Sequence, residues 1–443
     1  MTVKIGRRAV LAGLTAIGAS PLMAQSIPTN PDVVVIGAGS AGLAAGRVLQ
    51  QAGVSFVIVE SSDRVGGRAY TETGRLGQPI DVGCSWVNGA NNNPYAKLGY
   101  EKGFTMVDHS NADSDLFDMD GNPATGSDWV AYDKAWGAIL EAMADAGRSG
   151  KDVSAASVIP DVPWGASVRS WMGAMDYGVT LDQVSTKSYW NSADSQPSYF
   201  VKEGLGTLVA TLAEGMPISL NTPVTAIDYS RDGVTVETAS GTIRAKACLV
   251  TVSVGVLAAE KIKFTPALPV EKQEAINDIP MGLLMKVPLM FDGARLDLGE
   301  NNWVTYQLPE NKAGEGCFFV SWPCGWDYMM GFIGGQFAWD LYGEGQDAVV
   351  DYAMDELVKF AGSDAKKRFK GGYASDWADN PNVLGAYGAV RPGKYGARAK
   401  LGAPINEKLF FGGEATGGAI SALVHGAYMS GRFNAQQIVV ALG

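Results

Sequence analysis

The chain has 443 residues, of which 47% are hydrophobic and 18% charged, a composition typical of a folded globular protein large enough for two domains. Its 46 acidic residues outnumber its 35 lysines and arginines, so the net charge is −11. An acidic chain of this kind is not expected to bind nucleic acid or an anionic membrane surface.

The first 24 residues differ from the rest of the chain. In "IGRRAVLAGLTAIGASPLMAQ", the pair Arg7 and Arg8 precedes a mildly apolar run that ends at the small residue Ala24. This order predicts a twin-arginine signal peptide over residues 1–24, the alternative being a disordered N-terminus with a chance arginine pair. Export in folded form by the twin-arginine translocase to the periplasm or beyond would follow. Cleavage after Ala24 would remove three positive charges and change the net charge from −11 to −14.

A glycine-rich turn follows directly. The stretch "DVVVIGAGSAGLAAGRVLQQAGVSFVIVE", residues 32–60, predicts a buried strand, a turn, a helix and a second strand. Gly37 permits the tight turn, Gly39 lets the backbone approach a pyrophosphate, and Gly42 lets the helix pack on the strand. Glu60 ends the second strand, where an acid can bind ribose hydroxyls. This arrangement predicts a dinucleotide site, without separating NAD from FAD.

A second glycine turn comes next, in "SSDRVGGRAYT". It contains Arg64, Gly67 and Arg68, and arginine is well suited to bidentate contact with phosphate. A solvated basic loop is the alternative interpretation of this stretch alone. Four more segments are to be considered as a set with this turn: "IDVGCSWVNG", "YFVKEGLGTLVATLAEG", "TPVTAIDYSRDGVTVETASGTIRAKACLVTVSVGVLA" and "LFFGGEATGGAISALVHGAYMSGRFNAQQIV".

As a set, these segments resemble the flavin-containing amine oxidases, most closely the polyamine-oxidase branch, over nearly all of residues 30–440. The resemblance implies an α/β fold of the amine oxidase and glutathione-reductase-2-like type. A Rossmann-like FAD-binding domain would interleave with a mixed-sheet α+β substrate domain. The implied FAD-binding segments are 30–90, 200–285 and 376–443, and the implied substrate-binding segments are 91–199 and 286–375.

The resemblance also implies how FAD is held. Ala386 stands where monoamine oxidases carry a flavin-linking cysteine, so we expect non-covalent FAD. The implied FAD contacts are Gly37, Gly39, Ala41, Gly42, Glu60, Ser61, Arg64, Gly67, Arg68, Ser85, Trp86, Val224, Trp377, Gly413, Glu414, Ala422, Leu423 and Val424.

Lys286 is the one charge in the apolar run "MGLLMKVPLMF". An unpaired buried ammonium is costly, so a lysine placed there needs a partner or a use. By resemblance, it is the family's lysine whose ammonium holds a water against flavin N5, and we expect it to be catalytic. The alternative is a lysine at a sheet edge whose aliphatic chain is buried and whose ammonium group is solvated.

Tyr387, in "WADNPNVLGAYGAVRPG", falls on the family's aromatic wall beside the flavin. Its ring could orient an amine, partly by cation–π attraction. The opposite wall, usually aromatic, is Leu423 here, which breaks the two-sided aromatic cage of monoamine oxidases.

Four further residues are predicted to bind substrate. Trp86 stands where L-amino-acid oxidases hold a carboxylate with arginine, and Asn88 stands where some polyamine oxidases have an acid. His425 belongs to a His-Gly pair common in the polyamine branch, with a core histidine as the alternative. Trp322 is the pocket residue expected from the tryptophans that crowd residues 90–200 and 290–375.

The expected reaction is oxidation of an amine C–N bond to an imine, which water hydrolyses to a carbonyl and an amine or ammonia. The electrons would pass to O2, giving H2O2, or to a periplasmic carrier such as a cytochrome. The alternatives are a desaturase on the same fold, an L-amino-acid oxidase, or a silent FAD-binding protein. An NAD(P)H-dependent flavoenzyme is disfavoured because no second GxGxxG follows a strand.

Cysteine and histidine are scarce. The four cysteines form no CxxC pair and there are two histidines, so no metal site is expected. A Cys317–Cys324 disulfide is one alternative, but folding in the cytoplasm favours free thiols. A homodimer is a further expectation.

Overall fold

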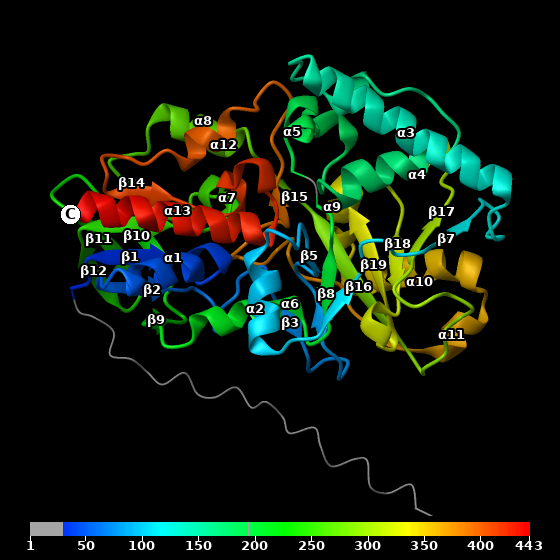
Figure 1. Cartoon of the computed structure of the whole chain (residues 1–443), viewed down its shortest axis with the longest axis horizontal. Helices are drawn as coiled ribbons and strands as arrows, with labels where there is room; N and C mark the ends of the chain where they lie inside the picture. Colours follow the sequence, from blue (N-terminus) through cyan, green and yellow to red (C-terminus); the bar gives the residue numbers. More distant parts are fainter. Residues whose placement is uncertain (1–29, 194) are drawn as a thin grey trace, which may run out of the picture.

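The computed structural model describes residues 30–193 and 195–443; the predicted signal peptide, residues 1–24, lies outside them. The described chain forms two lobes side by side (Figure 1). Each lobe is built around its own sheet, and the chain crosses between the lobes several times. The first lobe contains the sheet with β1, and the second lobe contains the sheet with β16.

The first lobe is centred on a five-stranded parallel sheet in the order β22-β13-β1-β2-β9. Its strands are β1 (Val33–Ile36), β2 (Phe56–Val59), β9 (Ile218–Ser219), β13 (Ala247–Val250) and β22 (Leu409–Phe411). Apart from the edge strand β9, every residue of these strands is buried. Helices cover both faces of such a sheet, which explains strands that are apolar throughout.

Two helices from opposite ends of the chain pack together on this sheet (Figure 1). They are α1 (Ser40–Gln51) and α13 (Val424–Leu442). Gly431 makes the close approach possible, because a Cβ there would lie 2.0 Å from the Ala41 carbonyl oxygen. The C-terminal segment is thereby fixed beside the turn that precedes α1.

The other elements of the first lobe are a second sheet, in the order β12-β11-β10-β14, and short helices. They are β10 (Val224–Asp228), β11 (Val234–Thr238), β12 (Gly241–Ala245), β14 (Lys263–Thr265), α2 (Pro94–Lys102), α6 (Leu205–Ala210), α7 (Val254–Ala258), α8 (Val270–Asn277) and α12 (Ala397–Gly402).

The second lobe is centred on a six-stranded sheet in the order β20-β16-β19-β18-β17-β7. It is mixed, because β17 pairs with β7 in parallel and the other pairs are antiparallel. Its strands are β7 (Ser114–Phe117), β16 (Leu284–Phe291), β17 (Trp303–Tyr306), β18 (Phe318–Ser321), β19 (Tyr328–Gly334) and β20 (Phe369–Gly372). Its helices are α3 (Gly126–Arg148), α4 (Gly165–Arg169), α5 (Thr186–Trp190), α9 (Gly335–Gly343), α10 (Gln346–Ala361) and α11 (Asp364–Arg368).

Three small sheets complete the fold. They join β3 (Thr71–Glu72) with β4 (Ile80–Asp81), β5 (Trp86–Val87) and β6 (Met106–Asp108) with β8 (Tyr199–Val201), and β15 (Met281–Gly282) with β21 (Tyr387–Gly388). The predicted fold class, a Rossmann-like domain interleaved with a mixed-sheet domain, is confirmed. The individual domain boundaries stay a prediction.

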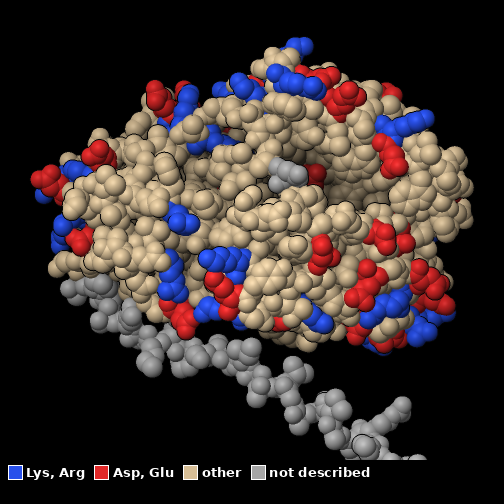
Figure 2. All heavy atoms as spheres, in the orientation of Figure 1, with Lys and Arg blue, Asp and Glu red and all other residues tan. Residues whose placement is uncertain are grey.

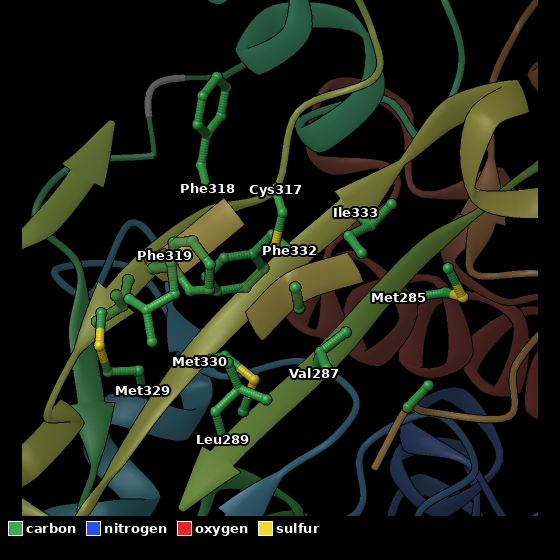
Figure 3. Packing of buried hydrophobic residues seen from close by; sticks show 14 of the residues in the cluster. Met285, Val287, Leu289, Cys317, Phe318, Phe319, Met329, Met330, Phe332 and Ile333 are labelled. Atoms are coloured by element: carbon green, nitrogen blue, oxygen red, sulfur yellow. The ribbon is translucent and has the colours of Figure 1, made fainter. Parts of the chain in front are cut away.

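Strand β16 positions the lysine of interest. Met285, Val287 and Leu289 lie on one face of the strand, within the apolar core of the second lobe (Figure 3). Side chains alternate between the faces of a strand, so Lys286 lies on the other face. That face is turned toward the end of β4 and the residues that follow it, because the Lys286 ammonium donates to the carbonyls of Asp81 and Gly83.

Three further findings concern the described residues. None of their helices is both long and apolar enough to span a bilayer. No group of three or more His, Cys, Asp or Glu side chains among them is arranged to hold a metal ion. All four cysteines are free, including Cys317 and Cys324, and three of the four are buried.

Candidate functional site

The turn between β1 and α1 requires glycine at two positions. Gly37 has φ +104°, and a Cβ there would lie 2.6 Å from Thr251 Oγ1. A Cβ on Gly42 would lie only 1.9 Å from the Gly37 carbonyl oxygen. Any side chain at either position would displace the turn, so the helix start and the strand end are held together by backbone contact.

The first turn of α1 faces open space. Gly39 is the N-cap residue and has no side chain to cap the helix. A Cβ on Gly39 would meet no heavy atom closer than 3.9 Å. The second glycine turn lies beside it, because the Gly66 N–H donates to the Ala38 carbonyl at 2.8 Å. Uncapped N–H groups at a helix start suit a phosphate, and no side chain at Gly39 obstructs the approach to them.

Glu60 is buried at the end of β2. Its Oε2 accepts a 2.7 Å hydrogen bond from the Ala38 N–H, and its Oε1 accepts from the N–H and Oγ of Ser62 at 2.9 and 2.8 Å. Ser61 donates more weakly at 3.3 Å. The carboxylate is thus fixed beside the glycine turn, within reach of a group bound there.

Arg68 and Glu414 form the charged pair of the site. Arg68 donates to Glu414 Oε1 at 2.9 Å and to the Ala386 carbonyl at 2.8 Å. The Gly388 N–H also donates to Glu414 Oε1, at 3.1 Å. Glu414 Oε2 is buried without a hydrogen-bond partner in the described part of the chain. An orphaned carboxylate oxygen is costly, and a hydroxyl of a bound cofactor would satisfy it.

Arg64 is packed rather than loosely solvated. Its guanidinium lies 3.9 Å from the centre of the Tyr70 ring and donates to the Gly67 carbonyl at 2.8 Å. Burial lowers the pKa of Arg64. Arg64 is therefore held by packing in the second glycine turn, and the alternative of a solvated basic loop does not apply to it.

The C-terminal segment "LFFGGEATGGAISALVHG" also reaches the glycine turn at the start of α1. The Gly413 N–H donates to Ser430 Oγ at 3.1 Å, and Ala422 adopts φ +64° directly before Leu423, the N-cap of α13. Ser40 Oγ, in the first turn of α1, donates to the Val424 carbonyl at 2.8 Å. The N-termini of α1 and α13 therefore meet at one place.

Two other predicted cofactor contacts lie at the edges of this region. Val224 begins β10, two residues after Thr222, whose N–H donates to the Glu60 carbonyl at 2.7 Å. Trp377 is buried and its indole N–H donates to the Val82 carbonyl at 2.8 Å. These contacts fix both residues, and their cofactor roles stay predictions.

Lys286 is buried, with 4% of its surface exposed. Its ammonium donates to the carbonyls of Asp81, at 3.1 Å, and Gly83, and to the hydroxyl of Ser85. Its Nζ also lies 5.4 Å from the centre of the Trp86 ring. The three ammonium protons thus have three acceptors, all supplied by the short segment from Asp81 to Ser85.

The electrostatics of Lys286 depend on burial and on Asp81. Burial lowers the pKa of Lys286 to about 8, and the Asp81 carboxylate opposes this shift. Burial raises the pKa of Asp81, against hydrogen bonds from Thr71 Oγ1 and the Leu205 N–H. Sequence reasoning missed Asp81 and Gly83 as partners, although both lie in the motif "IDVGCSWVNG" that it singled out.

A small cavity of about 30 Å³ lies beside this segment. Its lining includes Asp81, Ser85, Trp86, Trp326 and Phe332. Lys286 itself is shielded from this cavity, and Ser85 connects the two because it accepts from the ammonium and lines the space.

The aromatic residues around the cavity are firmly held. Trp86 stacks on Trp303, with ring centres 5.4 Å apart, and its indole N–H donates to His109 Nδ1 at 3.2 Å. Trp322 does not line this cavity: it is fully buried and meets the Phe291 ring edge-on at 5.6 Å. Trp86 therefore borders this cavity, whereas Trp322 is enclosed by the core.

Tyr387 lies on β21, and its hydroxyl donates to the Met175 carbonyl at 2.7 Å. Asn88 accepts a 2.9 Å hydrogen bond from Ser198 Oγ. His425, in the first turn of α13, is buried, and its Nδ1 has no partner among the described residues. Together with Leu423, these residues are placed by the fold, and their roles toward a substrate stay predictions.

Taken together, the site is that of a dinucleotide-dependent oxidoreductase with a buried lysine at the junction of two lobes. The family "Flavin containing amine oxidoreductase" matches residues 40–100 and 137–439. The chain belongs to this family. It is an FAD-dependent amine oxidoreductase, as the sequence analysis predicted.

Comparison with individual proteins agrees. The chain is 30% identical to polyamine oxidase 4 of Oryza sativa subsp. japonica, over 93% of this chain and 89% of that protein. It is 29% identical to polyamine oxidase 2 of Arabidopsis thaliana, over 92% and 88%. A solved structure of wild-type putrescine oxidase bound to putrescine shares the fold, with a TM-score of 0.77 at 19% identity, over 93% of this chain and 99% of that one.

The residues present fit FAD. The uncapped start of α1 suits its pyrophosphate, and the orphaned oxygen of Glu414 suits a hydroxyl donor. When bound, FAD supplies the two-electron redox chemistry. The protein's own part is to bind and orient the substrate, to exclude water and to hold protons.

Proposed function

We propose that this protein oxidises a C–N bond of an aliphatic amine of the polyamine class. One C–H hydride and one N–H proton leave the substrate, giving an imine. Water hydrolyses the imine to a carbonyl compound and a smaller amine or ammonia. The observation that carries the proposal is the buried Lys286 ammonium, held by Asp81, Gly83 and Ser85 at the junction of the lobes.

The chain's own residues have distinct tasks in this reaction. Tyr387 presents an aromatic ring that orients the amine. Lys286, with a pKa lowered to about 8 by burial, can lose a proton near neutral pH, and the nitrogen lone pair that is then free can accept a hydrogen bond from a water. Ser85 accepts from Lys286 and donates to the Asp81 carbonyl at 3.4 Å, so the hydroxyl and the ammonium share this carbonyl.

Two properties extend the proposal. The twin-arginine sequence supports export of the folded, FAD-loaded enzyme to the periplasm or beyond. There the two electrons would reduce O2 to H2O2, or pass singly to a carrier such as a cytochrome. The similarity to polyamine oxidases and to a putrescine oxidase supports linear diamines and polyamines as the substrate class.

Anaerobic mixing tests the proposal. The purified protein is mixed with polyamines, aryl-alkyl monoamines, cyclic secondary amines and amino acids, and the flavin absorbance at about 450 nm is followed. Rapid bleaching by putrescine or spermidine is expected, and readmitted air or oxidised cytochrome then identifies the acceptor. A yellow protein that no amine bleaches would contradict the proposal. Bleaching by amino acids alone would show that the protein is an amino-acid oxidase instead.

A further inference from the structure

His109 is a buried histidine that the reaction described so far does not use. It directly follows β6, and 3% of its surface is exposed. The Trp86 indole N–H donates to its Nδ1 at 3.2 Å, and its Nε2 lies 2.9 Å from the carbonyl oxygen of Asn301. An indole can only donate and a carbonyl can only accept. The His109 ring is therefore neutral and carries its proton on Nε2.

The ring is held in this state. Burial lowers the pKa of His109 to about 4, so both hydrogen bonds persist at neutral pH. The rings of Phe200 and Trp303 enclose it, with centres 4.3 and 5.1 Å from its own. A histidine with both nitrogens occupied is not available as an acid or a base. Its use must lie in what it holds.

What His109 holds is the indole of Trp86. Strand β5, which begins at Trp86, and strand β6 both pair with β8, so the two side chains meet across the strand that bears Phe200. The Trp86 ring also stacks on Trp303 at 5.4 Å and contacts Phe200 at 5.2 Å. Ring packing alone allows rotation within a plane, whereas a hydrogen bond to the indole nitrogen fixes the direction of the ring.

The Trp86 ring lies against the Lys286 ammonium. Lys286 Nζ is 5.4 Å from the centre of this ring and 5.9 Å from that of Phe332. An aromatic face attracts the ammonium and not the neutral amine, and tryptophan does so most strongly. Within the described chain, the titratable groups that act on Lys286 are the Asp81 carboxyl and the Cys84 thiol, and both favour the ammonium against burial.

The second hydrogen bond of His109 anchors it to the cavity beside Ser85. Asn301, which accepts it, also accepts a 2.7 Å hydrogen bond from the Cys324 N–H through its side-chain oxygen. Cys324 and Trp86 both line this cavity. His109 therefore joins two of its walls, one on β5 and one in the turn before β19.

The surface adds little charge near this group on the displayed face. Figure 2 shows that most charged side chains lie toward the edges of this face, and that uncharged atoms cover its centre, where Figure 1 places β5 and β8. Immediate neighbours such as the Trp86 ring therefore govern the charge of Lys286.

We propose that His109 is a positioning residue that holds the Trp86 ring against the Lys286 ammonium and thereby sets the charge state of the lysine that the reaction uses. The inference rests on the proposed function for its effect on turnover, but the charge of Lys286 can be measured without turnover.

Two neutral substitutions separate the two hydrogen bonds. His109→Asn keeps an oxygen near the place of Nδ1, which can still accept from Trp86. His109→Gln keeps an N–H near the place of Nε2, which can still donate to Asn301, and loses the acceptor for the indole. The FAD-loaded protein is labelled with 13C at lysine Cε, whose NMR shift follows the charge of each amine. The Lys286 signal is the one missing from Lys286→Met.

We expect the midpoint of the Lys286 titration to fall by about 0.5 to 1 pH unit in His109→Gln and by less than about 0.2 in His109→Asn, the scale of one buried cation–π contact. Trp86→Leu should lower it as much as His109→Gln. Trp326→Leu is the matched control, because its ring lines the same cavity but lies over Lys202, and it should leave the midpoint unchanged. With an active amine, the pH profile of flavin reduction should move to lower pH only in His109→Gln and Trp86→Leu.

A second measurement needs no variant. The chain has two histidines, so the 15N spectrum of the histidine-labelled wild type is simple, and it should show His109 neutral with its proton on Nε2 at pH 7. A proton on Nδ1, an unchanged midpoint in Trp86→Leu, or equal falls in His109→Gln and His109→Asn would overturn the proposal. If no amine reduces the flavin yet the midpoints follow the expected order, the proposed function fails and this inference stands.

Discussion

Two lysines of this protein are buried to the same extent, and comparing them shows what burial alone can indicate. Lys286 on β16 and Lys272 on α8 each expose 4% of their surface. Burial lowers the pKa of each to about 8. Each ammonium donates three hydrogen bonds. By these measures the two residues cannot be told apart.

Their surroundings differ. Lys272 donates to the carbonyls of Lys400, Leu401 and Ala403, at the C-terminal end of α12, where carbonyls lack helical partners and a cation is favourable. Lys286 instead has a hydroxyl among its acceptors, a buried carboxylate nearby and a cavity next to Ser85. A lysine that closes a helix end is structural, whereas one that joins two lobes beside a cofactor cradle is available for chemistry.

The largest effect is expected at Lys286. Lys286→Met should lower turnover of an active amine by about 100-fold or more, the scale of a lost proton-transfer group. Peroxide formation or cytochrome reduction, normalised to bound FAD, measures this. Turnover within a few-fold of wild type would place Lys286 in the same structural class as Lys272.

Glu414 extends the comparison from cations to a buried anion. Glu414→Gln should raise the dissociation constant of FAD about 10- to 100-fold, because a charge-assisted hydrogen bond with Arg68 is lost. Titration of the apoprotein with FAD, followed by flavin fluorescence, checks this value. Glu344→Gln, at an exposed position, is the control and should leave FAD binding unchanged.

Lys272 should affect stability and not catalysis. Lys272→Met leaves three carbonyls without their donor and should lower the free energy of unfolding by about 1–3 kcal/mol. Thermal unfolding of the FAD-loaded protein should show a lower Tm, with turnover close to wild type. A turnover defect as deep as that of Lys286→Met would show that the two lysines are not functionally distinct.

The smallest effect is a pH dependence of stability. A lysine whose folded pKa is about 8 loses its proton earlier in the folded chain than in the unfolded one, whose value is near 10.5. Stability should therefore rise as the pH increases through this window. Between pH 8 and about 9.5, before tyrosines titrate, the gain in Tm should be smaller in Lys272→Met than in wild type. An identical gain would refute the lowered pKa of Lys272.

Some of this site could be predicted from sequence because its determinants are local. Gly37 and Gly42 are required by the backbone of a single turn, and Glu60 ends the strand that follows. The fold class followed from the order of such motifs. Lys286 was recognised because one charge in an apolar run is conspicuous within eleven residues.

The rest depends on contacts between distant segments. The acceptors of Lys286 lie about 200 positions away in the chain, so periodicity could not assign them. Trp322 was chosen as an aromatic in a tryptophan-rich region, and the structure places it wholly inside the core, because residue type cannot tell a pocket wall from packing.

The most direct measurement follows the flavin of wild type, Lys286→Met and Lys272→Met by stopped flow, first during anaerobic reduction by putrescine and then during reoxidation by O2. The account predicts that at least one of these steps slows by about 100-fold in Lys286→Met and that neither changes more than about twofold in Lys272→Met. Equal rates in all three proteins would contradict it, because Lys286 would then be no more than a second buried structural lysine.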